Sequence, residues 1–249
     1  MSIKLINGDA LTELKKLGDC SIDICIIDPP YFLDTLDSNW SVETNEKRES
    51  NSHIKSLNCG MKFSKKQGHS FYTFMTPICS EINRVLKTGG FFLCFSNPRL
   101  YHHLALAVEN ADFELRDTLL WTYKQSQSKA MSMNTQIDRL DTTSEQKETL
   151  KKELDGWKTP MLKPCFEMIT LAQKSREGTF LNNWLEQHIG LMNTNQRHEN
   201  GNFPMTILST VQEENPLTYF SIKKPSKKEK GEYNNHLTVK PVELITHLI

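Results

Sequence analysis

The first half of the chain alternates between short apolar runs and stretches with apolar residues at helical spacing. The apolar runs predict strands over residues 3–6, 22–27, 91–95 and 119–121. Helical spacing, with a capping residue or a glycine at the ends, predicts helices over residues 10–17 and 71–86 and from residue 98 onward. Strands that alternate with helices of these lengths are typical of a parallel sheet with helices on both faces. The pattern therefore predicts an α/β fold.

The pattern changes after Lys124. Residues 125–160 carry few apolar side chains, and Thr142-x-x-Glu145 is a capping signature for a polar helix, either a solvated helix or a flap. Residues 166–172 predict one more strand, and residues 176–235 are rich in glycine and proline. The sequence thus divides into an α/β part over residues 1–124, an insertion over 125–222 and a final part over 223–249.

Composition narrows the class of protein. Hydrophobic residues make up 37% and charged residues 24% of the 249, a mixture that excludes a disordered chain. Thirty basic residues balance thirty acidic ones, which argues against a generally basic surface but allows a local basic patch. No apolar run approaches the roughly 18 residues of a membrane span, and the first residues lack the features of an export signal.

Cysteine and histidine usage fits a cytoplasmic protein. The six cysteines form no C-x-x-C pair and are predicted to be reduced and mostly buried. The histidines, including the pair His102-His103, lack the spacing of metal ligands, so no metal is predicted.

The tetrapeptide Asp28-Pro29-Pro30-Tyr31 directly follows the buried strand predicted over residues 22–27. Open α/β sheets bind ligands at the carboxyl ends of their strands, so the motif lies where a site is expected. The alternative interpretation is a proline-stiffened turn in which Tyr31 only packs. A carboxylate, a rigid backbone and an aromatic ring together at this position favour the site.

This quartet suits alkylation of an aromatic exocyclic amine, whose nitrogen is a poor nucleophile because its lone pair is delocalised into the ring. The Asp28 carboxylate can accept one N–H hydrogen bond and the Pro29 carbonyl the other, which frees the lone pair. Proline rings restrict φ and hold that carbonyl in place. The ring of Tyr31 offers a face on which an extruded base can stack. An activated methyl group held in line with the nitrogen then suffices, without a covalent intermediate.

The chain resembles the β class of DNA amino-methyltransferases, which methylate adenine N6 or cytosine N4. The matching motifs follow the family's order over nearly the whole chain: Gly8-Asp9-Ala10-Leu11, Asp28-Pro29-Pro30-Tyr31, Arg84-Val85-Leu86-Lys87-Thr88-Gly89-Gly90, Trp121 with Lys124, Lys163-Pro164-Cys165-Phe166-Glu167, Gly201-Asn202-Phe203-Pro204, the run from Phe220 through Lys230, and His236-Leu237-Thr238-Val239-Lys240-Pro241. The most specific feature is Asp-Pro-Pro-Tyr followed by His-x-Thr-x-Lys-Pro about two hundred residues later. The glycine-containing motifs by themselves would be weak evidence for the resemblance.

The resemblance implies an incomplete Rossmann-like sheet that uses S-adenosyl-L-methionine to methylate a base flipped out of double-stranded DNA. The residues that it implies as catalytic are Asp28, Pro29, Pro30 and Tyr31, and those that it implies as cofactor-binding are Asp9, Asp28, Thr238, Lys240 and Pro241. Lys240 would pair with the cofactor carboxylate. The alternatives are a helix N-cap for Asp9 and an exposed lysine before a helix for Lys240.

The same resemblance assigns roles to the three parts. Residues 1–124 would be catalytic, residues 125–222 would recognise the target, and residues 223–249 would begin the cofactor-binding part. The predicted contacts to DNA phosphates are Lys223, Lys224, Lys227, Lys228 and Lys230, for which ordinary solvated surface is the alternative. Further candidates for phosphate or guanine contacts are Lys129, Arg139, Lys158 and Arg197. Trp121 and Trp157 are predicted to be core and boundary residues.

One departure from the family concerns its glycine-rich cofactor loop. The eleven glycines form no G-x-G, and the sequence ends at Ile249 within an apolar helical pattern, so we expect that the last segment with the cofactor loop is missing. By the family's strand order, this would leave a gap in the sheet beside the strand over residues 22–27. Either a second polypeptide completes the sheet, or the chain is unstable and inactive, or residues 3–7 pair directly beside that strand.

The sequence therefore predicts a cytoplasmic, site-specific DNA methyltransferase of the restriction–modification kind. Adenine N6 is favoured because the quartet begins with Asp rather than Ser, which is a tendency of the family. The alternatives are an N4-cytosine methyltransferase, a non-catalytic DNA-binding fragment or subunit, and an enzyme that methylates RNA or a protein side chain.

Overall fold

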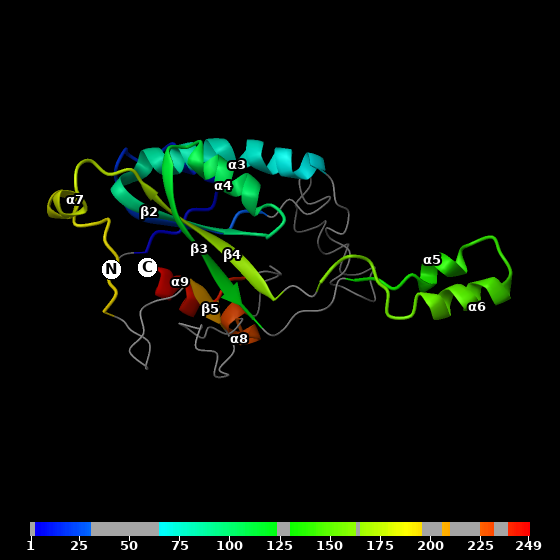
Figure 1. Cartoon of the computed structure of the whole chain (residues 1–249). Helices are drawn as coiled ribbons and strands as arrows, with labels where there is room; N and C mark the ends of the chain where they lie inside the picture. The colour runs from blue at the N-terminus through cyan, green and yellow to red at the C-terminus, as the bar shows by residue number, and fades with distance from the viewer. Residues whose placement is uncertain are drawn as a thin grey trace. The chain divides into compact units, whose positions relative to one another are not determined.

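A computed structural model describes residues 3–30, 65–123, 130–162, 165–195, 206–209, 225–231 and 239–249. The chain forms two compact units. The first comprises Met1–Thr122 and Phe166–Ile249, and the second comprises Tyr123–Cys165. Each unit is described by itself (Figure 1).

The first unit contains a mixed sheet. Its strands are β1 (Ile22–Ile27), β2 (Leu86–Ser96), β3 (Phe113–Thr122), β4 (Phe166–Lys174) and β5 (Ile207–Ser209), in the order β1-β2-β4-β3-β5. β1 is parallel to β2 and β3 is parallel to β5, but β4 runs antiparallel to both of its neighbours. The prediction of an α/β sheet is confirmed, whereas the prediction that it is entirely parallel is wrong. A strand buried on both faces has the same apolar pattern in either direction, so the direction of β4 could not be read from its residues.

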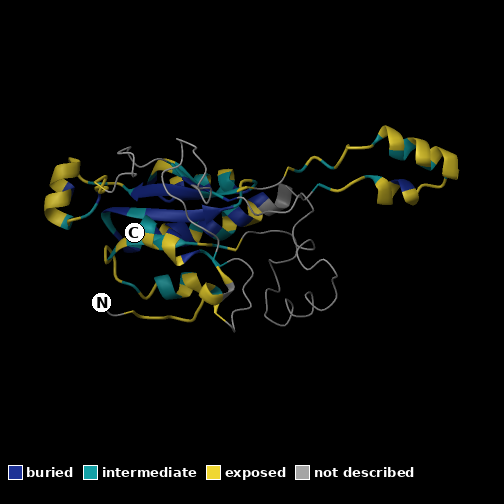
Figure 2. Ribbon diagram, turned by 90° about the horizontal axis from the view of Figure 1, so that it is seen from below, coloured by how far each residue is buried: buried dark blue, intermediate teal, exposed yellow. Residues whose placement is uncertain are grey.

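Helices cover both faces of this sheet (Figure 1). α3 (Lys65–Val85) and α4 (Tyr101–Glu109) lie on one face, and α9 (Val242–Leu248) lies on the other. The predicted apolar stripe of α3 is buried, as Phe71, Met75 and Ile82 are fully inaccessible to solvent. Buried residues are concentrated in the central strands and in the faces of α3 and α4 that contact them (Figure 2).

The sequence pattern predicts Gly89-Gly90 as the exit of the helix over residues 71–86. In the structure both glycines instead lie within β2. The register between β1 and β2 shifts between Ile22 and Ile24, so the pairing of β2 is irregular in this part. Gly89 has φ +79°, and a Cβ at this position would lie 2.4 Å from Nδ2 of Asn183. The buried amide of Gln173 donates hydrogen bonds to the carbonyl oxygens of Gly89 at 2.9 Å and Gly190 at 3.1 Å. A glycine is therefore needed here for close packing rather than for a helix end.

Residues 3–7 form no strand, contrary to the prediction. Ile3 is 96%, Leu5 95% and Ile6 46% exposed, so most of this apolar run is not packed against the described residues. Within the described part of the sheet β1 pairs with β2 alone, so the pairing of residues 3–7 beside β1, one of the three alternatives that the sequence left open, is not observed. An apolar run becomes a strand only where a partner supplies hydrogen bonds, which local sequence does not reveal.

α1 (Ala10–Leu14) begins where the sequence predicted and contacts α3. α7 (Phe180–Gln187) begins at Thr179, whose side chain accepts a hydrogen bond from the Asn182 amide. α8 (Lys227–Lys230) is preceded by its N-cap residue Ser226 and followed by its C-cap residue Gly231. No helix within the described residues is both long enough and apolar enough to cross a membrane.

The second unit contains α5 (Asn134–Asp138) and α6 (Ser144–Glu153). Thr143, rather than Thr142, caps α6 by accepting a hydrogen bond from the amide of Gln146. Lys151 of α6 joins the two helices through an ion pair with Asp138 of α5, and it also pairs with Glu148 of its own helix. Trp157 is 70% exposed, so its prediction as a boundary residue is wrong, whereas Trp121 of the first unit is buried as predicted. The second unit is small and has too few apolar side chains to cover the indole ring of Trp157.

These units differ from the predicted division of the chain. β4 and α7 lie within the expected insertion over residues 125–222, yet both belong to the first unit. The reason is that β4 is hydrogen-bonded between β2 and β3, in the middle of the sheet.

We expect thiol reagents to distinguish the cysteines by burial. Burial raises the pKa of both Cys25 and Cys79 to about 12, and raises that of Cys94 well above its usual value. Since the thiolate is the nucleophile, only about one Cys79 side chain in ten thousand is reactive at pH 8. Alkylation of the native protein at pH 8, read out by mass spectrometry, should modify the exposed Cys20 and Cys165 and spare Cys25, Cys79 and Cys94.

Cys20→Ser is the control that assigns the fast-reacting thiols. Raising the pH toward 12 should accelerate modification of Cys25 as its thiolate forms. Rapid modification of Cys79 at pH 8 would contradict its burial on the apolar face of α3.

Candidate active site

Three elements bring charged side chains to the same edge of the sheet. Asp28 follows the carboxyl end of β1. Glu167 lies near the beginning of β4, and the antiparallel direction of β4 brings that beginning to the carboxyl ends of β2 and β3. This is visible in the register, in which Met168 faces Ser96 and Glu167 faces Trp121. Lys240 arrives from the segment that leads into α9.

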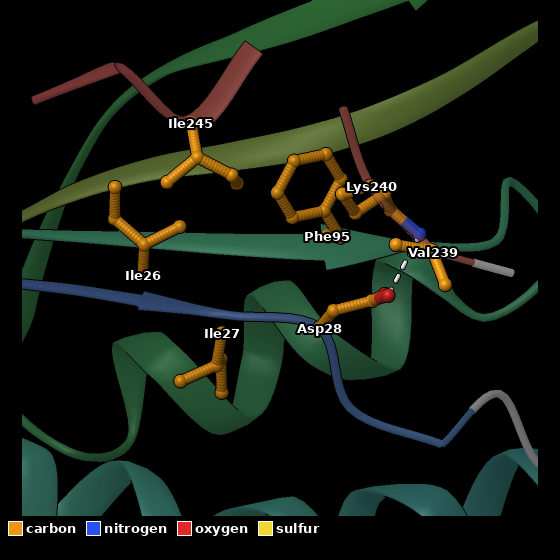
Figure 3. A pocket seen from close by; sticks show the side chains of 7 residues that line it. All are labelled: Ile26, Ile27, Asp28, Phe95, Val239, Lys240 and Ile245. Atoms are coloured by element: carbon orange, nitrogen blue, oxygen red, sulfur yellow. Dashed lines mark hydrogen bonds and ion pairs between the residues drawn. The ribbon is translucent and has the colours of Figure 1, made fainter. Parts of the chain in front are cut away.

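A cavity of about 460 Å³ lies at this edge, and its lining residues are Ile26, Ile27, Asp28, Phe95, Val239, Lys240 and Ile245 (Figure 3). The side chains of Ile26 and Ile245 point toward one another, while the carboxylate of Asp28 points toward Lys240. Mostly apolar walls with a few polar groups are typical of a site for a small organic molecule.

Lys240 is the centre of the electrostatic arrangement. Its ammonium nitrogen lies 2.8 Å from Oδ2 of Asp28 and 3.0 Å from Oε2 of Glu167. It also lies 5.0 Å from the centroid of the Phe95 ring, within cation–π range. The side chain of Lys240 is only 7% exposed, so these ion pairs are weakly screened by water. The Asp28 carboxylate is 28% exposed and is the more accessible partner.

Comparison with protein families identifies the chain. Residues 22–249 match the family model of N6/N4 methyltransferases, described as DNA methylases. The chain belongs to this family. The resemblance stated from the motifs is therefore confirmed at the level of the family.

The relatives of this DNA methylase family member are distant. It is 26% identical over 207 residues to the type II methyltransferase M.HindIII of Haemophilus influenzae, covering 77% of this chain and 65% of that protein. The chain thus spans a little less than two thirds of the length of this curated relative.

Solved structures show only weak similarity. The PvuII DNA methyltransferase (cytosine-N4-specific) has a TM-score of 0.39 and 12% identity, covering 81% of this chain and 54% of that one. TTHA0409 of Thermus thermophilus, complexed with S-adenosyl-L-methionine, has a TM-score of 0.37 and 14% identity, covering 69% of this chain and 54% of that one. Similarity at this level does not establish a shared site.

Several predicted site residues of this family member lie at the cavity and others do not. Asp28 and Lys240 line it, and Pro29 and Pro30 directly follow Asp28. Pro241 is the buried N-cap residue of α9. Tyr31 and Thr238 lie outside the described residues.

Asp9 does not line the cavity; it caps α1. One of its carboxylate oxygens accepts hydrogen bonds from the amide of Thr12 at 2.9 Å and from its hydroxyl at 2.8 Å. The amide hydrogen bond, with that of the hydroxyl, holds the pKa of the Asp9 carboxyl below its usual value. The structure therefore supplies a local reason for an acid at this position.

The predicted lysine cluster is only partly described. Lys223 and Lys224 lie outside the described residues, as do Lys129 and Arg197, and the backbone of Lys227, Lys228 and Lys230 forms α8. Glu229 of this helix accepts a hydrogen bond from the amide of Val242 at 2.9 Å, two residues after Lys240. This hydrogen bond connects α8, which contains Lys227, Lys228 and Lys230, to the segment that contains Lys240, a residue of the cavity.

Sequence reasoning gave no role to Glu167, although it belongs to a motif that carried the resemblance. The available signal was an acidic residue at the beginning of an otherwise apolar strand, where charges are seldom placed without a partner. That partner is Lys240, and the sequence could not show it because the antiparallel direction of β4 brings Glu167 to the edge of the sheet where Lys240 lies. Among the described residues, no group of three or more His, Cys, Asp or Glu side chains could hold a metal ion.

Proposed function

We propose that this chain carries the catalytic centre of a site-specific DNA methyltransferase that transfers a methyl group from S-adenosyl-L-methionine to N6 of adenine. The observation that carries the proposal is the Asp28 carboxylate, which is partly accessible and lines a largely apolar cavity at the carboxyl end of β1. Adenine is favoured because the quartet begins with Asp, following the tendency of the family. Membership of the DNA methylase family supports the same class of reaction.

In this proposal Asp28 and Pro29 act on the amine of a flipped base. The carboxylate accepts one N–H hydrogen bond and the Pro29 carbonyl accepts the other, so that the nitrogen lone pair is less delocalised into the ring. The Asp28 oxygen that contacts Lys240 is Oδ2, which leaves Oδ1 for the amine. A charged acceptor held in a partly desolvated cavity stabilises the positive charge that develops on the nitrogen. In the proposed reaction the N–CH3 bond would form as the sulfur–methyl bond breaks, which leaves a neutral thioether, and the amine would give up one N–H proton to Oδ1 of Asp28 and then to water.

The residues of the cavity fit S-adenosyl-L-methionine, which supplies an electrophilic methyl group when bound. A volume of about 460 Å³ lies within the usual range for small-molecule sites, about 300–1,000 Å³. The apolar walls formed by Ile26 and Ile245 suit its uncharged parts, while the Asp28 carboxylate and the Phe95 ring suit a sulfonium cation. In this proposal Lys240 acts as a partner of Asp28, because its ammonium group already contacts two carboxylates, those of Asp28 and Glu167.

Asp9, Thr238 and Pro241 remain proposed cofactor-binding residues on the basis of the resemblance alone. Double-stranded DNA is the proposed partner, with the lysines around α8 on its phosphates and the unit Tyr123–Cys165 as part of the target-recognition region. Arg139 and Lys158 of that unit are exposed and available for such contacts. A protein that modifies cellular DNA in this way acts in the cytoplasm of a bacterium.

Methyl transfer with a labelled donor tests the proposal. The protein is incubated with S-adenosyl-L-methionine carrying a tritiated methyl group and with unmethylated duplex DNA, which is then digested to nucleosides and separated by chromatography. We expect label in N6-methyladenine at one recurring sequence. Label in N4-methylcytosine would overturn the choice of base but not the reaction, and label in RNA in preference to DNA would overturn the substrate.

A further inference from the structure

Glu167 is not among the residues that line the cavity, yet it shares a cation with Asp28. Lys240 lies between the two carboxylates, with 2.8 Å to Asp28 and 3.0 Å to Glu167. The three residues come from β1, β4 and the segment before α9, and Asp28 and Lys240 are 212 positions apart in the sequence. Only folding brings them together.

A lysine in this position needs a second anchor. Its ammonium group sits on a flexible four-carbon stem, and holding it in one conformation costs side-chain entropy. Glu167 is itself only 18% exposed and begins a rigid central strand, so its carboxylate is a fixed point for that ammonium group. The charge-assisted hydrogen bond to Glu167 therefore restricts where Lys240 can meet Asp28.

The position of Lys240 in turn decides which oxygen of Asp28 is accessible. Oδ2 accepts a hydrogen bond from Lys240, and the carboxylate is oriented by that contact. Asp28 directly follows β1, and the two prolines after it restrict the backbone but do not fix the rotamer of its side chain. A side chain whose rotamer is held by a neighbour keeps its reacting geometry better than one that is free.

We infer that Glu167 is a positioning residue for methyl transfer: it holds Lys240 against Oδ2 of Asp28 and so presents Oδ1 to the target amine. This inference rests on the proposed function, because it concerns the step in which Asp28 accepts the amine N–H. It gives a role to the acidic residue of the Lys-Pro-Cys-Phe-Glu motif over residues 163–167.

A double-mutant cycle tests whether Glu167 acts through Lys240. We expect Glu167→Gln to lower kcat about tenfold, with KM for DNA and for S-adenosyl-L-methionine within about twofold, and Lys240→Met to lower kcat about a hundredfold. If Glu167 acts only through Lys240, the double variant should equal Lys240→Met within about twofold. The matched control is Glu114→Gln, a glutamate on β3 that pairs with Arg116 away from the cavity, and its kcat should stay within about twofold.

Additive losses, with the double variant about a thousandfold slower than the unchanged protein, would overturn the inference, because they would show an independent structural role. An unchanged kcat in Glu167→Gln would overturn it as well. Glu167→Asp provides a second variant that keeps the charge, and it should recover part of the loss.

A measurement without DNA or cofactor separates this inference from the proposed function. The ammonium group of Lys240 should give a slowly exchanging ¹⁵N signal by NMR, assigned by its loss in Lys240→Met. We expect Glu167→Gln to broaden or abolish this signal and Glu114→Gln to leave it unchanged. If the unchanged protein transferred no methyl group, the proposed function would fail; a signal indifferent to Glu167→Gln would refute the positioning contact itself.

Discussion

Asp28→Asn should lower the rate of methyl transfer about 100- to 1,000-fold, while the affinity for DNA stays within about twofold. The substitution preserves size but replaces a charged acceptor with an amide, which is a weaker acceptor and carries two N–H donors. It also removes one of the two carboxylates that pair with Lys240, whose side chain is only 7% exposed. Initial rates with a tritiated methyl donor and DNA binding by fluorescence anisotropy measure the two quantities.

Asp23, on the strand that precedes Asp28, provides a matched control. Asp23 of β1 pairs with Lys87 at 2.6 Å, but its side chain is 59% exposed and does not line the cavity. Surface ion pairs of this kind contribute about 0–1 kcal/mol, so Asp23→Asn should leave transfer almost unchanged. Full activity in Asp28→Asn would show that this carboxylate does not accept the amine, and the proposed mechanism would have to be abandoned.

Phe92→Ala should lower the free energy of unfolding of the first unit by about 3–5 kcal/mol. Phe92 is fully buried in β2, and its ring centroid lies 5.2 Å from that of Phe113 on β3. Truncation would remove this aromatic contact and leave a cavity within the main hydrophobic cluster, which cannot collapse completely because the sheet is rigid. Urea denaturation followed by circular dichroism measures the change.

Leu106→Ala provides the comparison for this loss. Leu106 lies on α4 and is 48% exposed, so its truncation should change the free energy of unfolding by no more than about 0.5 kcal/mol. A similar small change in Phe92→Ala, with an unaltered denaturant slope, would contradict the assignment of Phe92 to a tightly packed core.

Local patterns determined much of the first unit. The apolar run of β1, the helical stripe of α3 and the apolar residues of β2 were all predicted in place, because burial of one face imposes a spacing that is visible within a few residues. The motif that begins at Asp28 was predicted to follow β1, and Asp28 itself lines the cavity. The family, too, could be stated from motifs in the sequence and was confirmed by comparison.

Tertiary structure decided what depends on partners far apart in the chain. The direction of β4 and the lack of a strand over residues 3–7 follow from which strands are available to pair, and the apolar pattern is the same in every case. The meeting of Lys240 with Asp28 and Glu167 depends on that pairing. Spacing along the sequence determines the face on which a side chain lies, but only the packed sheet determines which charge it meets there.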